Sequence, residues 1–128
     1  MTFKKSFNSV AIITRAVPRL RAFYENVLQQ AGEGDEAFVV FSIQGLKLSL
    51  CSTTLVEGMA SGAVADAGSG RCVLEFEVED VDREYERLKQ LAVSFVKLPT
   101  TQPWGLRSVW FRDPDGHLIN FYAPAASG

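Results

Sequence analysis

Residues that bind metals or form disulfides are scarce in this sequence of 128 residues, which has one histidine and two cysteines. Two cysteines do not make a disulfide framework in a chain of this length, and a single histidine excludes a two-histidine metal motif. The sequence also lacks an excess of basic charge, because its net charge is −2 and its pI is near 5.4. We therefore expect no nucleic-acid partner.

Long apolar runs are missing as well. No run approaches the roughly 18 residues of a membrane span, and the first residues show no signal-peptide pattern. The glycine pairs within residues 32–34 and 68–70 lack the third glycine of a dinucleotide-binding loop. We expect a cytoplasmic domain with no membrane partner and no cofactor.

What the chain does have is a composition of 47% hydrophobic and 22% charged residues, which is ordinary for a globular domain. Pro18 stands in the first turn of a predicted helix over residues 18–28, and Asp80 caps a second predicted helix over residues 81–91. A loop is predicted over residues 99–105. Short β-branched or alternating runs predict strands at residues 7–14, 37–43, 46–51, 72–78, 94–98, 107–112 and 118–122.

The two halves of the chain repeat the same pattern. Residues 10–17 and 74–81 both pass from a strand into a helix, and residues 45–49 and 116–120 both pass from a turn into a closing strand. This duplication predicts an α+β domain made of two similar modules around a cleft. Residues 53–70 are rich in glycine, alanine and serine and are the linker candidate. We expect one domain over 1–128, with module one at 1–52, a linker at 53–70 and module two at 71–124.

The segment PWGLRSVWFRDPDGHLINFY, residues 103–122, resembles a signature of the glyoxalase/bleomycin-resistance/extradiol-dioxygenase family, the vicinal oxygen chelate superfamily. Residues 10–28 resemble the first strand and helix of that family, and residues 73–88 resemble its third motif. The resemblance implies two tandem βαβββ modules that form a curved mixed sheet around a cleft. It also implies a homodimer, which would cover the edges that a duplicated unit leaves open.

The resemblance further implies where a metal would bind. The four ligand positions of the family fall on Ser9, Ser49, Val73 and Asn120. Family enzymes carry His, Glu or Gln there, and hydroxyl, isopropyl and amide groups do not replace those ligands. We therefore expect no metal. The segment between Leu28 and Phe38 leaves little room for the second strand of module one, which we expect to be short or absent.

Strand alternation predicts which side chains face the cleft, and the resemblance adds the loop that carries Trp104. Two or three aromatic rings beside the carboxylate of Glu75 suit a flat, positively charged ligand. The alternative is that Glu75 and Glu77 lie on a solvated face. The predicted ligand-binding residues are Ser9, Lys47, Ser49, Val73, Glu75, Trp104, Ser108, Trp110, Asn120 and Tyr122.

Three functions remain open. The first is a metal-independent protein that sequesters or recognises an aromatic, cationic small molecule. The second is a lyase, isomerase or dioxygenase of the same family with Glu75 as a general base. The third is a domain kept for assembly or regulation. We assign no catalytic residue: His117 is predicted to be a surface turn residue, and Cys51 and Cys72 are predicted to stay reduced.

Overall fold

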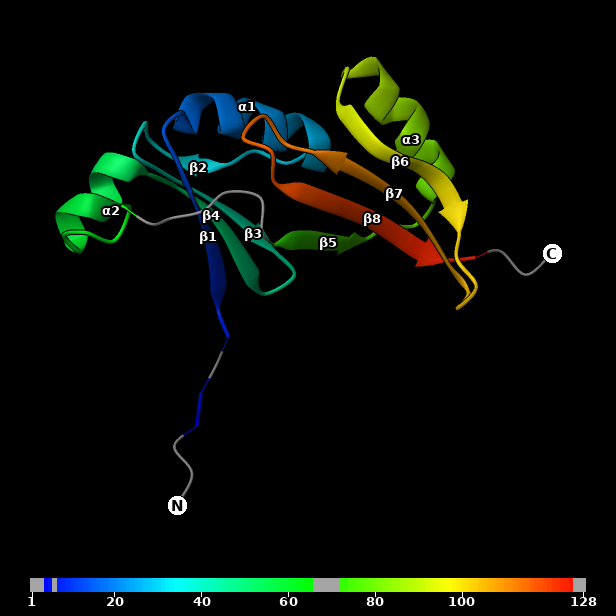
Figure 1. The fold of residues 1–128 in the computed structure, drawn as a ribbon, viewed down its shortest axis with the longest axis horizontal. Helices are drawn as coiled ribbons and strands as arrows, with labels where there is room; N and C mark the ends of the chain where they lie inside the picture. Colours follow the sequence, from blue (N-terminus) through cyan, green and yellow to red (C-terminus); the bar gives the residue numbers. More distant parts are fainter. Residues whose placement is uncertain (1–3, 6, 66–71, 126–128) are drawn as a thin grey trace. The chain divides into compact units, whose positions relative to one another are not determined.

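The computed structural model describes residues 4–5, 7–65 and 72–125, and it forms two compact units, Met1–Ala67 and Gly68–Gly128. Each unit contains one four-stranded sheet (Figure 1). The boundary between the units lies within the predicted linker. None of the described helices combines the length and the apolar character that a membrane crossing requires.

Unit 1 runs from a strand through a helix into three further strands and a short helix. Its sheet has the order β1-β4-β3-β2, with β1 parallel to β4 and the other pairs antiparallel. Its elements are β1 (Ser9–Thr14), α1 (Val17–Leu28), β2 (Glu33–Gly34), β3 (Phe38–Ile43), β4 (Leu46–Ser52) and α2 (Thr53–Met59).

Unit 2 repeats this topology. Its sheet has the order β5-β8-β7-β6, again with one parallel pair, β5 and β8. The predicted α+β fold class and the internal duplication are therefore confirmed. Its elements are β5 (Val73–Glu77), α3 (Val81–Gln90), β6 (Ser94–Thr101), β7 (Leu106–Arg112) and β8 (Leu118–Pro124).

The core of unit 1 forms between α1 and the sheet. Leu20 and Tyr24 are fully buried on the apolar side of the helix. The centroid of the Tyr24 ring lies 6.3 Å from the centroid of the Phe41 ring on β3. Because side chains alternate along a strand, the residues of β3 on either side of Phe41 point to the other face of the sheet.

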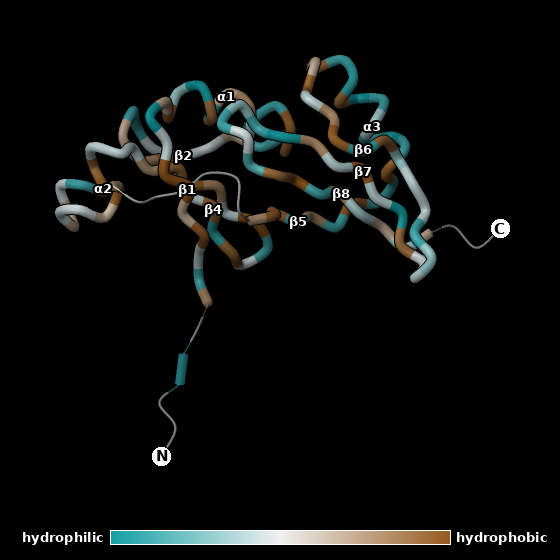
Figure 2. The backbone as a smooth tube through the Cα atoms, in the orientation of Figure 1, coloured by the Kyte–Doolittle hydropathy of each residue, from teal (hydrophilic) through white to brown (hydrophobic). Residues whose placement is uncertain are grey.

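The core of unit 2 has the same construction with more rings. Tyr85 of α3 packs on Phe95 of β6 at 5.1 Å, and Phe111 and Phe121 meet edge to face at 5.1 Å between centroids. Figure 2 shows apolar and polar residues succeeding one another along β7 and β8. The apolar set faces α3, so Trp110 and Asn120 point to the opposite face.

Two predicted boundaries are wrong. Strand β6 continues to Thr101, whereas residues 99–101 were expected in a loop. Pro99 is tolerated because β6 is an edge strand with a register shift between Lys97 and Thr100. The predicted linker also begins with α2, whose first turn is capped by the Ser52 hydroxyl, which accepts from the Leu55 N–H at 3.0 Å. Residues 66–70 of that linker lie outside the described residues.

The second strand of module one is reduced to the two residues of β2, in line with the expectation that it is short. Side chains of α1 hold the approach to it. The Arg21 guanidinium donates to the Gly32 carbonyl at 2.7 Å, and the Glu25 carboxylate accepts from the Gly32 N–H at 2.9 Å. These contacts lower the pKa of Glu25, chiefly through the bond from Gly32. Helix α1 therefore holds the backbone directly before β2 through two side chains.

Candidate functional site

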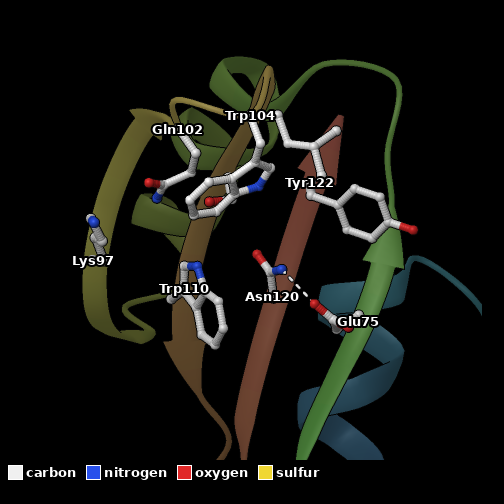
Figure 3. Close-up of a pocket in the computed structure, with 9 residues that line it drawn as sticks. Glu75, Lys97, Gln102, Trp104, Trp110, Asn120 and Tyr122 are labelled. Carbon is white, nitrogen blue, oxygen red and sulfur yellow. Dashed lines mark hydrogen bonds between the residues drawn. The ribbon is translucent and has the colours of Figure 1, made fainter. Parts of the chain in front are cut away.

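Unit 2 has a pocket of about 570 Å³ on the face of its sheet opposite α3. Every strand of the sheet and the turn after β6 contribute to its lining (Figure 3). This volume lies within the range of about 300–1,000 Å³ that is usual for small-molecule sites. The lining residues are Glu75, Lys97, Gln102, Trp104, Leu106, Ser108, Trp110, Asn120 and Tyr122.

Four of these residues form one row across the sheet, which we call the cross-strand row. Glu75 on β5 is opposite Asn120 on β8, and Asn120 is opposite Trp110 on β7. Trp110 is in turn opposite Lys97 on β6. Residues opposite one another in neighbouring strands project from the same face of the sheet. The row therefore presents a carboxylate, an amide, an indole and an ammonium group, in that order.

The amide of Asn120 is fixed by Glu75. Its Nδ2 donates to Glu75 Oε2 at 3.0 Å. A carboxylate accepts hydrogen bonds, so the NH₂ group of the amide must face Glu75 and Oδ1 must point elsewhere. Figure 3 shows this arrangement, with the amide oxygen directed away from Glu75. The orientation of the amide is thus set by its hydrogen bond.

Asn120 Oδ1 is an unusual atom in this pocket. The residue is only 6% exposed, and among the described residues Oδ1 has no hydrogen-bond partner. Leaving a buried acceptor unpaired costs about 1–3 kcal/mol, and most buried polar groups in proteins are paired. A group that donates a hydrogen bond to Oδ1 would remove this cost.

Trp104 stands at the rim of the pocket on a tight turn. The turn is closed by two backbone bonds, from the Gln102 N–H to Leu106 O at 2.7 Å and from the Gly105 N–H to Gln102 O at 3.0 Å. Gly105 has φ +90°, a conformation that favours glycine. The turn leaves the indole 70% exposed while it lines the pocket, so its ring is accessible to a ligand.

Only some of the predicted ligand-binding residues line this pocket. Val73 lies on the same side of β5 as Glu75 but does not line the pocket, and Ser9, Lys47 and Ser49 belong to the sheet of unit 1. Ser9 is opposite Lys47, and Ser49 is 5% exposed. The predicted residues that do line the pocket are Glu75, Trp104, Ser108, Trp110, Asn120 and Tyr122.

Sequence reasoning missed Lys97, Gln102 and Leu106. Gln102 and Leu106 flank the turn that carries Trp104, so their closeness to Trp104 in the sequence could have predicted that they line the pocket. Lys97 lies opposite Trp110 only because the ladder of β6 shifts between Phe95 and Lys97. Such a shift is not visible in the alternation of a single strand.

The prediction that His117 is a surface turn residue is wrong, because His117 is only 8% exposed. Its Nδ1 lies 2.8 Å from Asp113 Oδ2, and its backbone N–H donates to Asp113 Oδ1 at 2.9 Å. The hydrogen bond to Asp113 raises the pKa of His117, and Asp113 and Asp115 add charge attraction in the same direction, while burial opposes the shift. The buried Asp113 carboxylate needs donors, and His117 supplies two.

The family model of the Glyoxalase/Bleomycin resistance protein/Dioxygenase superfamily matches residues 6–121. The chain belongs to this superfamily. It is 31% identical over 94 residues to YraH, an uncharacterized protein of Bacillus subtilis, a match that covers 70% of this chain and 73% of YraH.

Solved structures of superfamily proteins share the fold. A glyoxalase/bleomycin resistance protein/dioxygenase from Nocardioides superposes with a TM-score of 0.81 at 24% identity, covering 100% of this chain and 89% of that one. A family enzyme from Burkholderia phytofirmans PsJN superposes with a TM-score of 0.83 at 16% identity, covering 94% and 99%. At these identities the likeness shows the fold and leaves the chemistry to the residues of this chain.

The metal positions implied for this superfamily do not carry a suitable donor set. Val73 has no ligand atom, and the amide nitrogen of Asn120 is already engaged with Glu75. Ser9 and Ser49 offer only hydroxyl groups, whereas transition metals prefer imidazole, carboxylate or thiolate ligands. Over residues 4–5, 7–65 and 72–125, no three His, Cys, Asp or Glu side chains gather as a metal-binding group.

Proposed function

We propose that this protein binds a small aromatic compound with a positively charged, N–H-bearing group, without a metal, and thereby recognises or sequesters it. One observation carries the proposal: Asn120, whose nitrogen is bonded to the Glu75 carboxylate and whose oxygen Oδ1 is unpaired and directed away from it, lines the same pocket as Glu75 and two tryptophans. A ligand that donates hydrogen bonds and bears positive charge complements both groups.

The rings supply the apolar part of the interaction. Trp104, Trp110 and Tyr122 all line the pocket, and aromatic side chains bind flat rings through burial and through stacked or edge-to-face contacts. A cation near the face of an indole is attracted by its quadrupole, with a gain of about 0.5–1 kcal/mol at exposed sites. Ring and charge recognition therefore reinforce each other in one pocket.

Glu75 and Asn120 supply the polar part. The carboxylate of Glu75 keeps accepting capacity after its bond with Asn120, and Asn120 Oδ1 accepts as well. A carboxylate and an amide oxygen in one pocket favour a group with more than one N–H donor, such as an amidinium. Because Glu75 is exposed, we expect its charge to contribute about 1 kcal/mol, the scale of exposed ion pairs.

The rival hypothesis is a lyase, isomerase or dioxygenase with Glu75 as a general base. The resemblance implies that such chemistry in this superfamily uses a metal, and the ligand positions it implies fall on Ser9, Ser49, Val73 and Asn120. The single histidine is not among the residues that line the pocket, and it pairs with Asp113. We therefore prefer binding without catalysis.

The test compares three naphthalene derivatives by isothermal titration calorimetry: a carboxamidine, a carboxamide and a trimethylammonium salt. The carboxamidine has charge and N–H donors, the carboxamide has only N–H donors, and the trimethylammonium salt has only charge. We expect the carboxamidine to bind most tightly. Glu75→Gln should weaken it about fivefold and leave the carboxamide within about twofold.

Two results would overturn the proposal. One is that none of the three compounds binds at millimolar concentration. The other is that the trimethylammonium salt binds as tightly as the carboxamidine, which would mean that the two acceptors do not recognise N–H donors.

A further inference from the structure

The cross-strand row carries opposite charges at its two ends. Glu75 stands on β5, one edge of the sheet, and Lys97 stands on β6, the other edge. Both line the same pocket, and Figure 3 shows Asn120 and Trp110 between them. Within the described part of the chain, the ammonium group of Lys97 has no ion pair or hydrogen bond, so it is available to a ligand.

The spacing of the strands sets the distance between these charges. Neighbouring strands lie about 4.8 Å apart, so three intervals separate the backbones of β5 and β6 by about 14 Å. A ligand that meets both charges must carry its own charged groups at opposite ends of a rigid body. A compound with both charges on one carbon, such as a free α-amino acid, reaches only one end of the row.

The centre of the row suits that rigid body. Trp110 lies between the two charges, and the exposed indole of Trp104 lines the same pocket from the turn after β6. Gln102, which follows β6 directly, lines the pocket as well, and its amide can donate or accept a hydrogen bond. The end at Lys97 therefore offers a cationic donor, and the end at Glu75 offers acceptors.

We propose that the ligand is a dipolar aromatic compound that lies across the strands. Its cationic N–H group meets Glu75 and Asn120, its ring lies on Trp110, and an anionic group, such as a carboxylate, meets Lys97. This inference rests on the proposed function and adds the anionic group and the direction in which the ligand lies.

A different reason for Lys97 exists and makes a different prediction. Edge strands often carry lysine, because a charged side chain opposes pairing with the edge of another sheet. A lysine that served only that purpose and did not contact the ligand would give a carboxylate and a neutral ligand equal affinities. The charge preference of binding therefore separates the two explanations.

The experiment uses two biphenyl carboxamidines of equal length, one with a carboxylate at the far end and one with a neutral carboxamide there. Their dissociation constants are measured by calorimetry at low ionic strength, where exposed charges are least screened. The intact chain should bind the carboxylate compound about fivefold more tightly. Lys97→Met, which keeps most of the apolar side chain, should abolish that preference.

The matched control is Lys89→Met. It removes the same charge from unit 2, but Lys89 lies on α3 and pairs with Glu86 at 2.9 Å. Helix α3 covers the other face of the sheet, so Lys89→Met should keep the fivefold preference. A general effect of net charge would instead reduce the preference equally in both variants.

Two kinds of failure are distinguishable. If both compounds bind equally well to the intact chain, or if Lys97→Met keeps the preference, the dipolar ligand is wrong and the proposed binding function stands. If neither compound binds, the proposed function falls and this inference falls with it.

Discussion

The two units share one topology but differ on the face of the sheet that their main helices leave uncovered. The row of unit 1 that corresponds to the cross-strand row consists of Ala11, Ser49, Val40 and Glu33. The cross-strand row of unit 2 holds a carboxylate, an amide, an indole and an ammonium group at the same places. Duplication has therefore preserved the strand order while the two rows have come to carry different chemistry.

The opposite, helix-facing side explains why the fold survived this divergence. Val39, Phe41 and Leu50 are fully buried in unit 1, as are Val109, Phe111 and Ile119 in unit 2. These apolar side chains hold each sheet to its helix through burial, which is the largest favourable contribution to folding. Residues on the other face do not contribute to that packing, so they are free to form a binding site.

The first prediction concerns Trp110, in the middle of the cross-strand row. Trp110→Val gives unit 2 the residue that unit 1 has in the corresponding place, Val40. We expect the affinity for every aromatic probe to fall by about 2 kcal/mol, or roughly thirtyfold, because the stacking surface is lost. Calorimetry should show a loss for both the naphthalene carboxamide and the carboxamidine, with the cationic carboxamidine losing at least as much. A loss confined to the charged probe would contradict this role of the ring.

The second prediction concerns the unpaired oxygen of Asn120. Asn120→Leu replaces the amide with an apolar side chain of similar size and removes the unsatisfied acceptor. We expect the free energy of unfolding of the unliganded protein to rise by about 1 kcal/mol, while carboxamidine binding weakens. Urea unfolding measures the first effect. If the variant is instead less stable by 1 kcal/mol or more, the unpaired oxygen does not destabilise the unliganded protein as we infer.

The third prediction sharpens a contrast between two hairpins. A two-residue turn, Gln44 and Gly45, joins β3 to β4, whereas residues 113–117 join β7 to β8 and contain the buried pair of Asp113 and His117. Because the pKa of folded His117 is raised, its pairing stabilises the protein fully below the unfolded value of about 6.5. That stabilisation is lost as the pH rises through the higher folded pKa.

The measurement is urea unfolding of the natural chain and of His117→Asn across neutral pH. The natural chain should exceed the variant in stability most at acidic pH, and the difference should shrink as the pH rises. A difference that is constant or grows with pH would mean that the pKa of His117 is not raised in the folded state.

Much of the fold could be predicted from the sequence, because the apolar spacing of helices and strands reflects burial. The same alternation placed Glu75, Trp110 and Asn120 on one face. Lys97 could not be placed, because the register shift in β6 depends on its pairing with β7. His117 was misjudged because its burial depends on the Asp113 carboxylate, whose own burial is a tertiary property.

The smallest expected effect concerns an exposed ion pair away from the pocket. Arg107 forms a two-bonded pair with Asp82, at 2.9 and 2.8 Å, and the hydrogen bonds from Arg107 lower the pKa of Asp82. Asp82→Asn should change the free energy of unfolding by less than about 1 kcal/mol, because both groups are partly exposed. Probe affinities should stay within about twofold, and a larger loss of binding would show that the site extends beyond the pocket described.

The central claim is that the pocket of unit 2 binds the ligand, and its most direct test is an NMR titration of the ¹⁵N-labelled protein with the naphthalene carboxamidine. The chain has two tryptophans, and both line the pocket of unit 2, so their indole N–H signals report on it. We predict that both indole signals and the side-chain amide signals of Asn120 shift together and saturate with one affinity. If the carboxamidine binds while these signals stay unchanged, the pocket of unit 2 is not the binding site.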